Sequence, residues 1–244
     1  MEIIFGILII FFAAFVKGLT GFAFPMIAVP FLVLLFPLQV VVAVVVVLGF
    51  GASSMVIINC IKDIDIKKIW PLILAGIIFT PIGAFSLIYM NSNYLKLALG
   101  IIMLLFSITL ILNKSFPVKN EKAAYVLAGS LSGFLGGSLS IQSPPVVLFF
   151  SNQGMSKQTF RANLTLHLVV LTFVTIVTYF INGLYNTEIV ITILYFAPAM
   201  VLGVFAGIKL SKKVSETLFK KIVLIILIVL GIWTMLNAIR NLAA

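Results

Sequence analysis

The sequence predicts an all-α polytopic membrane protein built from two inverted repeats. Of its 244 residues, 63% are hydrophobic and only 9% are charged, whereas soluble domains carry about 25% charged residues. The apolar residues gather in runs of about 20, the length of a membrane-spanning helix, with short polar loops between them. Two of these runs are interrupted by glycine and proline. We therefore expect each repeat to contain a broken-helix hairpin and three transmembrane helices, which gives eight to ten membrane segments.

The expected elements follow in order along the chain. The first apolar run, 3–36, is too long for one span and is interrupted at 17–25. The second interrupted run is 123–150. Unbroken spans are expected at 40–61, 70–90, 94–112, 162–181, 189–210 and 218–239. The first repeat then covers 1–112, a cytoplasmic linker covers 113–122, and the second repeat covers 123–244.

The second interruption, Gly129–Pro145, holds four glycines, five serines, a glutamine and two prolines. Irregular backbone is tolerated at membrane depth only where protein buries it or where it lines a water-filled cavity. Pro144 and Pro145 suit the first turn of a helix that follows the break. The free N–H groups and the dipole of that turn favour an anion.

The first interruption, Lys17–Pro25, is shorter than the second and resembles part of it. Leu19–Phe22 resembles Leu131–Phe134, 112 residues later. Two breaks in matching positions of two halves point to the binding site of a transporter. The alternative is that the glycines form close helix contacts of the small-xxx-small kind.

Loop charges predict the topology. If each broken segment returns to the face from which it started, 13 of the 16 lysines and arginines fall on one face. Only Lys96 and Arg240 fall on the other face, and Lys17 lies at a hairpin tip. The positive-inside rule then places the 13 cations in the cytoplasm and both termini outside. Each half holds an odd number of helices, so the halves are inverted. The net charge of +10 is thus explained by topology and by contact with anionic lipid, without nucleic acid.

The candidate substrate-binding residues come from the two breaks and from the span after the second. They are Lys17, Thr20, Gly21, Phe22, Gly133, Gly136, Gly137, Ser138, Ser140, Gln142, Ser143, Arg161, Asn163 and His167. Intramembrane Lys17 is either a functional cation or a lysine that snorkels to the interface. Arg161 either binds an oxyanion with its planar fork or is an ordinary positive-inside residue. Asn163 and His167 share a helix face, and His167 is a ligand donor, a proton carrier or a hydrogen-bonded packing residue.

Several motifs resemble the TauE/SafE family. Those of the second-repeat type are Ser132–Ser138, Ser143–Leu148, Gly154 and Phe160–Asn163, and those of the first-repeat type are Gly18–Phe24, Pro30 and Ala43. Members of this family are described as sulfite and organosulfonate exporters. The resemblance implies export of small sulfur-containing anions across the cell membrane. This sequence is more polar than the family pattern near Gln142 and Ser143, which favours a polar ligand.

We therefore expect a secondary transporter of small anions, with alternating access, in a bacterial cell membrane. The partners implied are a small anionic substrate and membrane lipid, and the oligomeric state is left open. An anion channel, or a permease for carboxylates or other organic anions, is the alternative. The single histidine and single cysteine cannot form a metal cluster, so we expect no metal and no cofactor. Every carboxylate lies in a loop or at an end of the chain, and no catalytic dyad supports an enzyme.

Overall fold

The computed structural model describes residues 1–112, 120–151, 153–211 and 216–243. These residues form α-helices and one short 3-10 turn, η1 (Ile61–Asp63). The helices are α1 (Glu2–Thr20), α2 (Phe24–Leu32), α3 (Leu38–Ile57), α4 (Ile66–Tyr89), α5 (Ser92–Leu112), α6 (Glu121–Leu139), α7 (Ser143–Ser151), α8 (Lys157–Ile181), α9 (Thr187–Leu210) and α10 (Glu216–Ala243). Among the described helices, α1, α3, α4, α5, α8 and α9 are long and apolar enough to cross a membrane. The predicted all-α polytopic class is confirmed.

Both interrupted runs form a long helix, a sharp break and a short helix. The breaks are Gly21–Ala23, between α1 and α2, and Ser140–Gln142, between α6 and α7. Each long helix ends on a left-handed residue, Gly21 with φ 93° and Ser140 with φ 59°. The short helices α2 and α7 have nine residues each, about 14 Å of helix. They therefore reach about half-way through a hydrocarbon core of about 30 Å.

The second break is much shorter than the sequence suggested, because α6 runs unbroken through Gly129 to Leu139. Glycines at 129, 133 and 137 lie four residues apart, on the side of α6 that meets α4. A Cβ atom at these glycines would lie 2.2, 2.3 and 2.1 Å from the backbone oxygens of Leu72, Gly76 and Thr80. The small-xxx-small interpretation is therefore right for this part of the motif.

The expected match of Leu19–Phe22 with Leu131–Phe134 is also wrong, because only the first of these segments lies at a break. Adding 119 to the first and last residue numbers of α1 and α2 gives the first and last residue numbers of α6 and α7. A shift of 119 also aligns the starts of α3 and α8, at Leu38 and Lys157. The structural register is therefore 119 in this part of the chain, and the shift of 112 is a coincidence of glycine-rich helix sequence.

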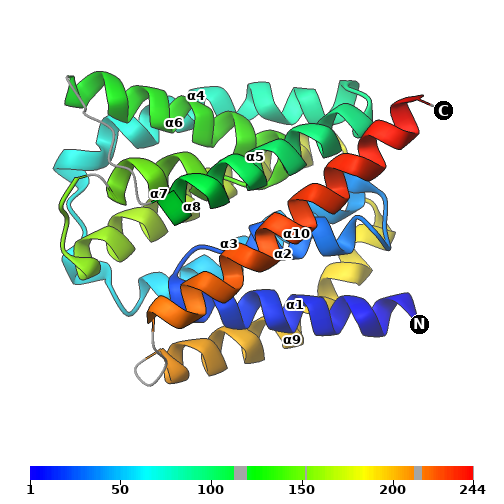
Figure 1. Ribbon diagram of the computed structural model, residues 1–244, viewed down its shortest axis with the longest axis horizontal. Helices are drawn as coiled ribbons and strands as arrows, with labels where there is room; N and C mark the ends of the chain where they lie inside the picture. Colours follow the sequence, from blue (N-terminus) through cyan, green and yellow to red (C-terminus); the bar gives the residue numbers. More distant parts are fainter. Residues whose placement is uncertain (113–119, 152, 212–215, 244) are drawn as a thin grey trace.

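The two sets of five helices pack in the same pattern. Helix α1 lies along α9 as α6 lies along α4, while α3 meets α8 and α5 meets α10. Likewise, α2 contacts α10 as α7 contacts α5. Figure 1 shows α1 and α6 running in opposite directions, with both termini at the same end of the bundle. This exchange pattern is the one that inverted repeats produce.

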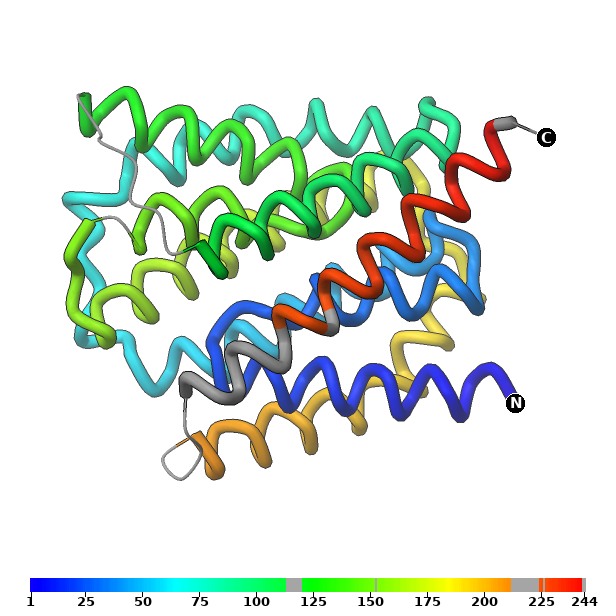
Figure 2. Tube along the Cα trace, viewed as in Figure 1, coloured from blue at the N-terminus to red at the C-terminus, as the bar shows by residue number. Residues whose placement is uncertain are grey.

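The tube in Figure 2 shows which helix ends share a face. Helices α3, α5, α7 and α9 end at the side opposite the two termini, which we call the loop face. The turns after α2, α4 and α8 lie at the same side as the termini. Both broken segments are thus hairpins that return to their starting face. Most of the expected linker, residues 113–119, lies outside the described residues.

Candidate functional site

The two hairpin tips meet at a small enclosed cavity in the interior of the bundle. It is lined by Lys17, Phe22 and Pro25 from the first hairpin, by Gln142 and Ser143 from the second, and by Gly49, Ser53, Leu168 and Thr172 from α3 and α8. The space open to the centre of a water-sized sphere is about 10 Å³, enough for about one water molecule. Lys17, Ser53 and Gln142 are at most 1% exposed, so in this structure the cavity is too small for a sulfur oxyanion.

The cavity lies at the centre of the internal symmetry. Ser53 of α3 and Thr172 of α8 line it together, and they are 119 residues apart. Gly49 and Leu168 form a second pair with the same separation. The register found from the helix ends thus recurs in the lining residues. Lys17 breaks the symmetry, because Gly136 occupies the corresponding position of the second hairpin.

Lys17 is a buried lysine, and its hydrogen-bond partner among the described residues is neutral. Its side chain is 1% exposed, and Nζ donates a hydrogen bond to Ser53 Oγ at 2.6 Å. Ser53 Oγ in turn donates to the Gly49 oxygen at 2.8 Å. No carboxylate of the described residues pairs with Lys17; an ion pair elsewhere in the bundle joins Lys68 and Glu121 at 3.4 Å. Lys17 therefore does not snorkel to an interface, and it lines the cavity without a carboxylate partner among the described residues.

Gln142 supplies a second donor at the cavity. Its side chain is 1% exposed, and Nε2 has no partner among the described residues. The backbone oxygen of Gln142 accepts a hydrogen bond from Ser132 Oγ at 2.6 Å. Ser132 Oγ also lies 2.7 Å from His167 Nε2. His167 thus contacts the second break only through Ser132, and it is absent from the residues that line the cavity.

Arg161 binds the end of α1 instead of the cavity. Its Nη2 donates to the Gly18 oxygen at 3.1 Å, and a Cβ atom at Gly21 would lie 3.4 Å from Arg161 Cγ. A cation at the carbonyl end of a helix is favourable because the helix dipole is negative there. Leu168, which lines the cavity, lies seven residues further along α8, a rise of about 10 Å. Arg161 therefore stands between the cavity and the loop face.

The other hairpin has an equivalent contact on the opposite side of the cavity. Ser140 Oγ, at the second tip, donates to the oxygen of Val42 at 3.1 Å. Val42 and Arg161 are also 119 residues apart. We call Arg161–Gly18 and Ser140–Val42 the two tip contacts. The first lies between the cavity and the loop face, and the second lies between the cavity and the face that holds the termini.

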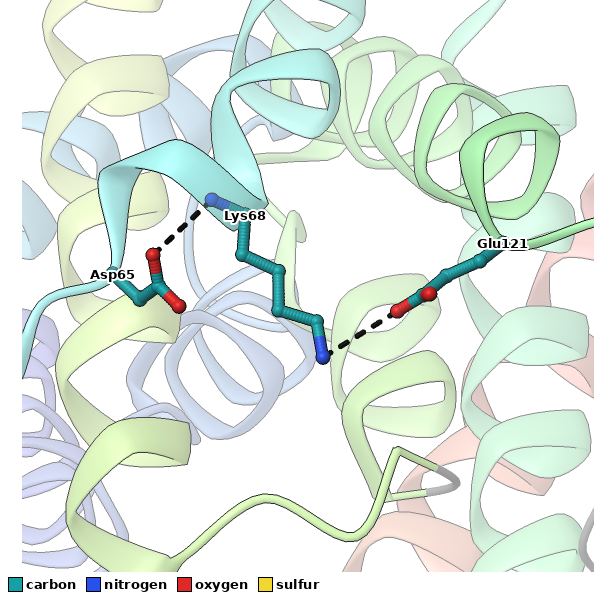
Figure 3. A network of polar contacts seen from close by, with 3 residues as sticks. All are labelled: Asp65, Lys68 and Glu121. Carbon is teal, nitrogen blue, oxygen red and sulfur yellow. Dashed lines mark hydrogen bonds and ion pairs between the residues drawn. The ribbon is translucent and has the colours of Figure 1, made fainter.

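Asn163 lies at the loop face, where it joins α8 to the start of α4. Its Oδ1 accepts a hydrogen bond from the Asp65 backbone N–H at 2.8 Å. Figure 3 shows the adjoining network, in which the Lys68 backbone N–H donates to Asp65 Oδ1 at 3.3 Å and Lys68 Nζ pairs with Glu121. These contacts tie α4, α6 and α8 together at that face, away from the cavity.

Several predicted residues shape the breaks without lining the cavity. Thr20 Oγ1 accepts from the backbone N–H groups of Phe22 and Ala23 at 3.3 and 3.4 Å, which holds the first turn. Gly136 leaves room for Gln142, whose Cγ would be 2.3 Å from a Cβ there. Ser138 Oγ donates within α6, to the Phe134 oxygen at 2.8 Å.

Four lining residues were missed by reasoning from the sequence: Gly49, Ser53, Leu168 and Thr172. Pro25 belongs to the predicted interruption, although it was not among the candidate binding residues. The cluster Gly49–Ser54 contains two glycines and two serines in the middle of an apolar span, and this was a usable signal. Thr172 gave none by itself, because a threonine in a helix commonly bonds a backbone oxygen of the preceding turn, as Thr172 does to Leu168. Only the 119-residue register connects it with Ser53.

Two discontinuous helices that meet at a buried polar cavity, on an axis relating inverted halves, define the architecture of a membrane transporter. The comparison with family models agrees. The chain belongs to the sulfite exporter TauE/SafE family, whose model matches residues 6–234. Neither a curated protein nor a solved structure matches the chain.

Proposed function

We propose that this protein is a secondary transporter that exports small sulfur-containing oxyanions or organosulfonates across the cell membrane. The observation that supports the proposal is the position of Lys17, a buried lysine in the lining of a central cavity where no described residue is a carboxylate. An unpaired charge is costly to bury, and an anion in the cavity would offset that cost. Family membership supports sulfur-containing anions as the class.

The donors of the cavity suit an anion with several oxygens. Lys17 Nζ and Gln142 Nε2 are free to donate to it, and the positive end of the α7 dipole points from the same break. The hydroxyl protons of Ser53 and Thr172 are already given to backbone oxygens of their own helices. The apolar lining residues Phe22 and Leu168 would contact the organic part of a sulfonate.

Transport would proceed by alternating access about the inverted-repeat interface. A cavity with room for about one water must widen before a sulfur oxyanion enters. The repeats 1–112 and 123–244 would rock against each other, opening one tip contact at a time. The loop face would lie in the cytoplasm and both termini outside, as the charges of the loops indicate. An anion channel would need a continuous path, and a cavity with room for about one water does not provide one at this level of the bundle.

Flux into proteoliposomes tests the proposal, with sulfite, thiosulfate, sulfoacetate, taurine and acetate as substrates. We expect saturable flux and counter-transport of at least one sulfur anion. Lys17→Gln should weaken its apparent affinity roughly thirtyfold, because a lost charge-assisted partner costs about 2 kcal/mol. Lys96→Gln, a partly exposed lysine of α5, is the matched control. Equal flux in wild type and Lys17→Gln would overturn the assignment, and flux of acetate alone would favour a carboxylate permease.

A further inference from the structure

The position of Lys17 suggests how anion transport is coupled to proton movement, an inference that rests on the proposed function. We propose that Lys17 carries a proton with the substrate: its amine takes up one proton as an anion enters the cavity and releases it as the anion leaves. A monovalent anion and one proton would then cross together, without net charge movement.

The surroundings of Lys17 support this coupling. The helices packed against α1 are α2, α3 and α9. Helices α2 and α3 contain no charged residue, and α9 has Glu188 and Lys209 near its two ends. Gly18, next to Lys17, packs against Gly207 and Ile208, so Lys17 lies near the Lys209 end. Glu188, at the other end of α9, lies 21 residues before Lys209, which is about 31 Å of helix.

Helix α8, across the cavity, adds Arg161 and His167. Arg161 is a second cation, bonded to Gly18 beside Lys17, and His167 is bonded to Ser132. The groups of these helices near Lys17 are therefore cationic or neutral. The carboxylates next to this end of α8, Asp63 and Asp65, lie at the loop face beside Cys60 and Asn163, and neither forms an ion pair with Lys17. In a dry site, the anion and the proton attract each other strongly. Each must therefore increase the affinity of the site for the other by the same factor.

The proton balance of the cycle is complete. On one side of the membrane, the amine lone pair of Lys17 forms an N–H bond with a proton from water while the anion enters. The ammonium and the anion then occupy the closed cavity as a pair. On the other side, the anion leaves and the ammonium returns the proton to water. The empty cavity reorients with a neutral amine, whose N–H groups still reach Ser53 Oγ. No other carrier is needed.

Methanesulfonate is a suitable probe, because it stays a monovalent anion across the working pH range and cannot carry a proton itself. Wild-type proteoliposomes with an internal pH dye receive an inward methanesulfonate gradient, with potassium and valinomycin setting the membrane potential. We expect the lumen to acidify by one proton per anion, at a rate that the potential does not change. Methanesulfonate uptake without acidification, or uptake driven by an inside-positive potential, would overturn the proposal.

Lys17→Arg separates the proton role from the charge, since arginine keeps its proton in proteins. We expect this variant to take up methanesulfonate without acidifying the lumen and to become sensitive to potential. His167→Gln, the matched control, should keep proton coupling; its loss there, with coupling intact in Lys17→Arg, would move the role to His167. If wild-type vesicles take up neither methanesulfonate nor any sulfur compound of the panel above, the proposed function itself fails. Anion uptake without proton movement refutes the coupling alone.

Discussion

Replacing Arg161 with glutamine tests whether this residue closes the cavity or binds the substrate. The Arg161 guanidinium reaches the Gly18 oxygen at 3.1 Å, about 10 Å along α8 from the cavity lining. A hydrogen bond to a charged group contributes about 1.5–3 kcal/mol. Its loss should therefore raise the fraction of molecules open toward the loop face roughly tenfold to a hundredfold.

Access to the cavity can be measured with a single reporter cysteine. Thr172→Cys, in a Cys60→Ala background, places a thiol in the lining of the cavity. An impermeant maleimide is applied from either face, to vesicles of opposite orientation. We expect Arg161→Gln to speed labelling from the loop face by the factor above, with little change from the other face. Ser140→Ala, at the second tip contact, should do the reverse with a smaller effect.

One interpretation of the sequence was that Arg161 binds the oxyanion. The same experiment decides between this role and closure of the cavity. If labelling of Thr172→Cys is unchanged in Arg161→Gln while the apparent affinity for the anion falls about thirtyfold, the guanidinium binds substrate. In that case the tip contact seen here is not the closure, and our reasoning fails. Arg161→Lys keeps the charge without the fork and should give an intermediate labelling rate.

Three further outcomes are expected. Gly137→Ala should lower the unfolding temperature in detergent by several degrees, because its Cβ would lie 2.1 Å from a backbone oxygen of α4, and overpacking costs about 1–3 kcal/mol; Ser130→Ala, on the exposed side of α6, should change it little. Burial raises the pKa of the Cys60 thiol, and Asp63 adds to this while Arg161 opposes it. Alkylation of native Cys60 should accordingly be slow at pH 7 and accelerate as pH rises, and a fast reaction at pH 7 would contradict this burial. Cysteines introduced at Asn91 and Gln158 should label from opposite faces, with Gln158 on the cytoplasmic side; labelling of both from outside would refute the topology.

Hydropathy and loop charge predicted the fold well, because both act over long stretches of chain. The interrupted runs became the hairpins α1–α2 and α6–α7, and Pro144 lies in the first turn of α7 as expected. The exact extent of the second break was less predictable. Glycine breaks a helix in water-exposed settings, but in a membrane bundle the same residue lets two helices touch. Only the position of α4 shows which use applies to Gly133.

The candidate site was predicted in part for the same reason. Lys17, Phe22, Gln142 and Ser143 line the cavity, because each lies at a true break or within one turn of it. Arg161 and Asn163 were placed at the site by their motif, and the structure shows them bonded to Gly18 and to Asp65, outside the cavity lining. A sequence motif brings residues together along the chain, but only the path of the neighbouring helices shows which of them share a cavity.

Lys17 and Gly136 occupy equivalent positions of the two hairpins, but only one of them carries a charged side chain. The hairpin that supplies the charge of the site is therefore independent of how the chain is oriented in the membrane. Loop cations fix how the protein inserts, whereas the binding charge belongs to one hairpin tip and could be exchanged for the other. A chain carrying Lys17→Gly and Gly136→Lys, with Gln142→Ala to vacate the space that Gln142 fills beside Gly136, would insert as before. The lysine that faces the substrate would then belong to the opposite hairpin. Comparing the transport rates of such a molecule in the two directions with those of the native protein would show how far these rates depend on the position of a single lysine.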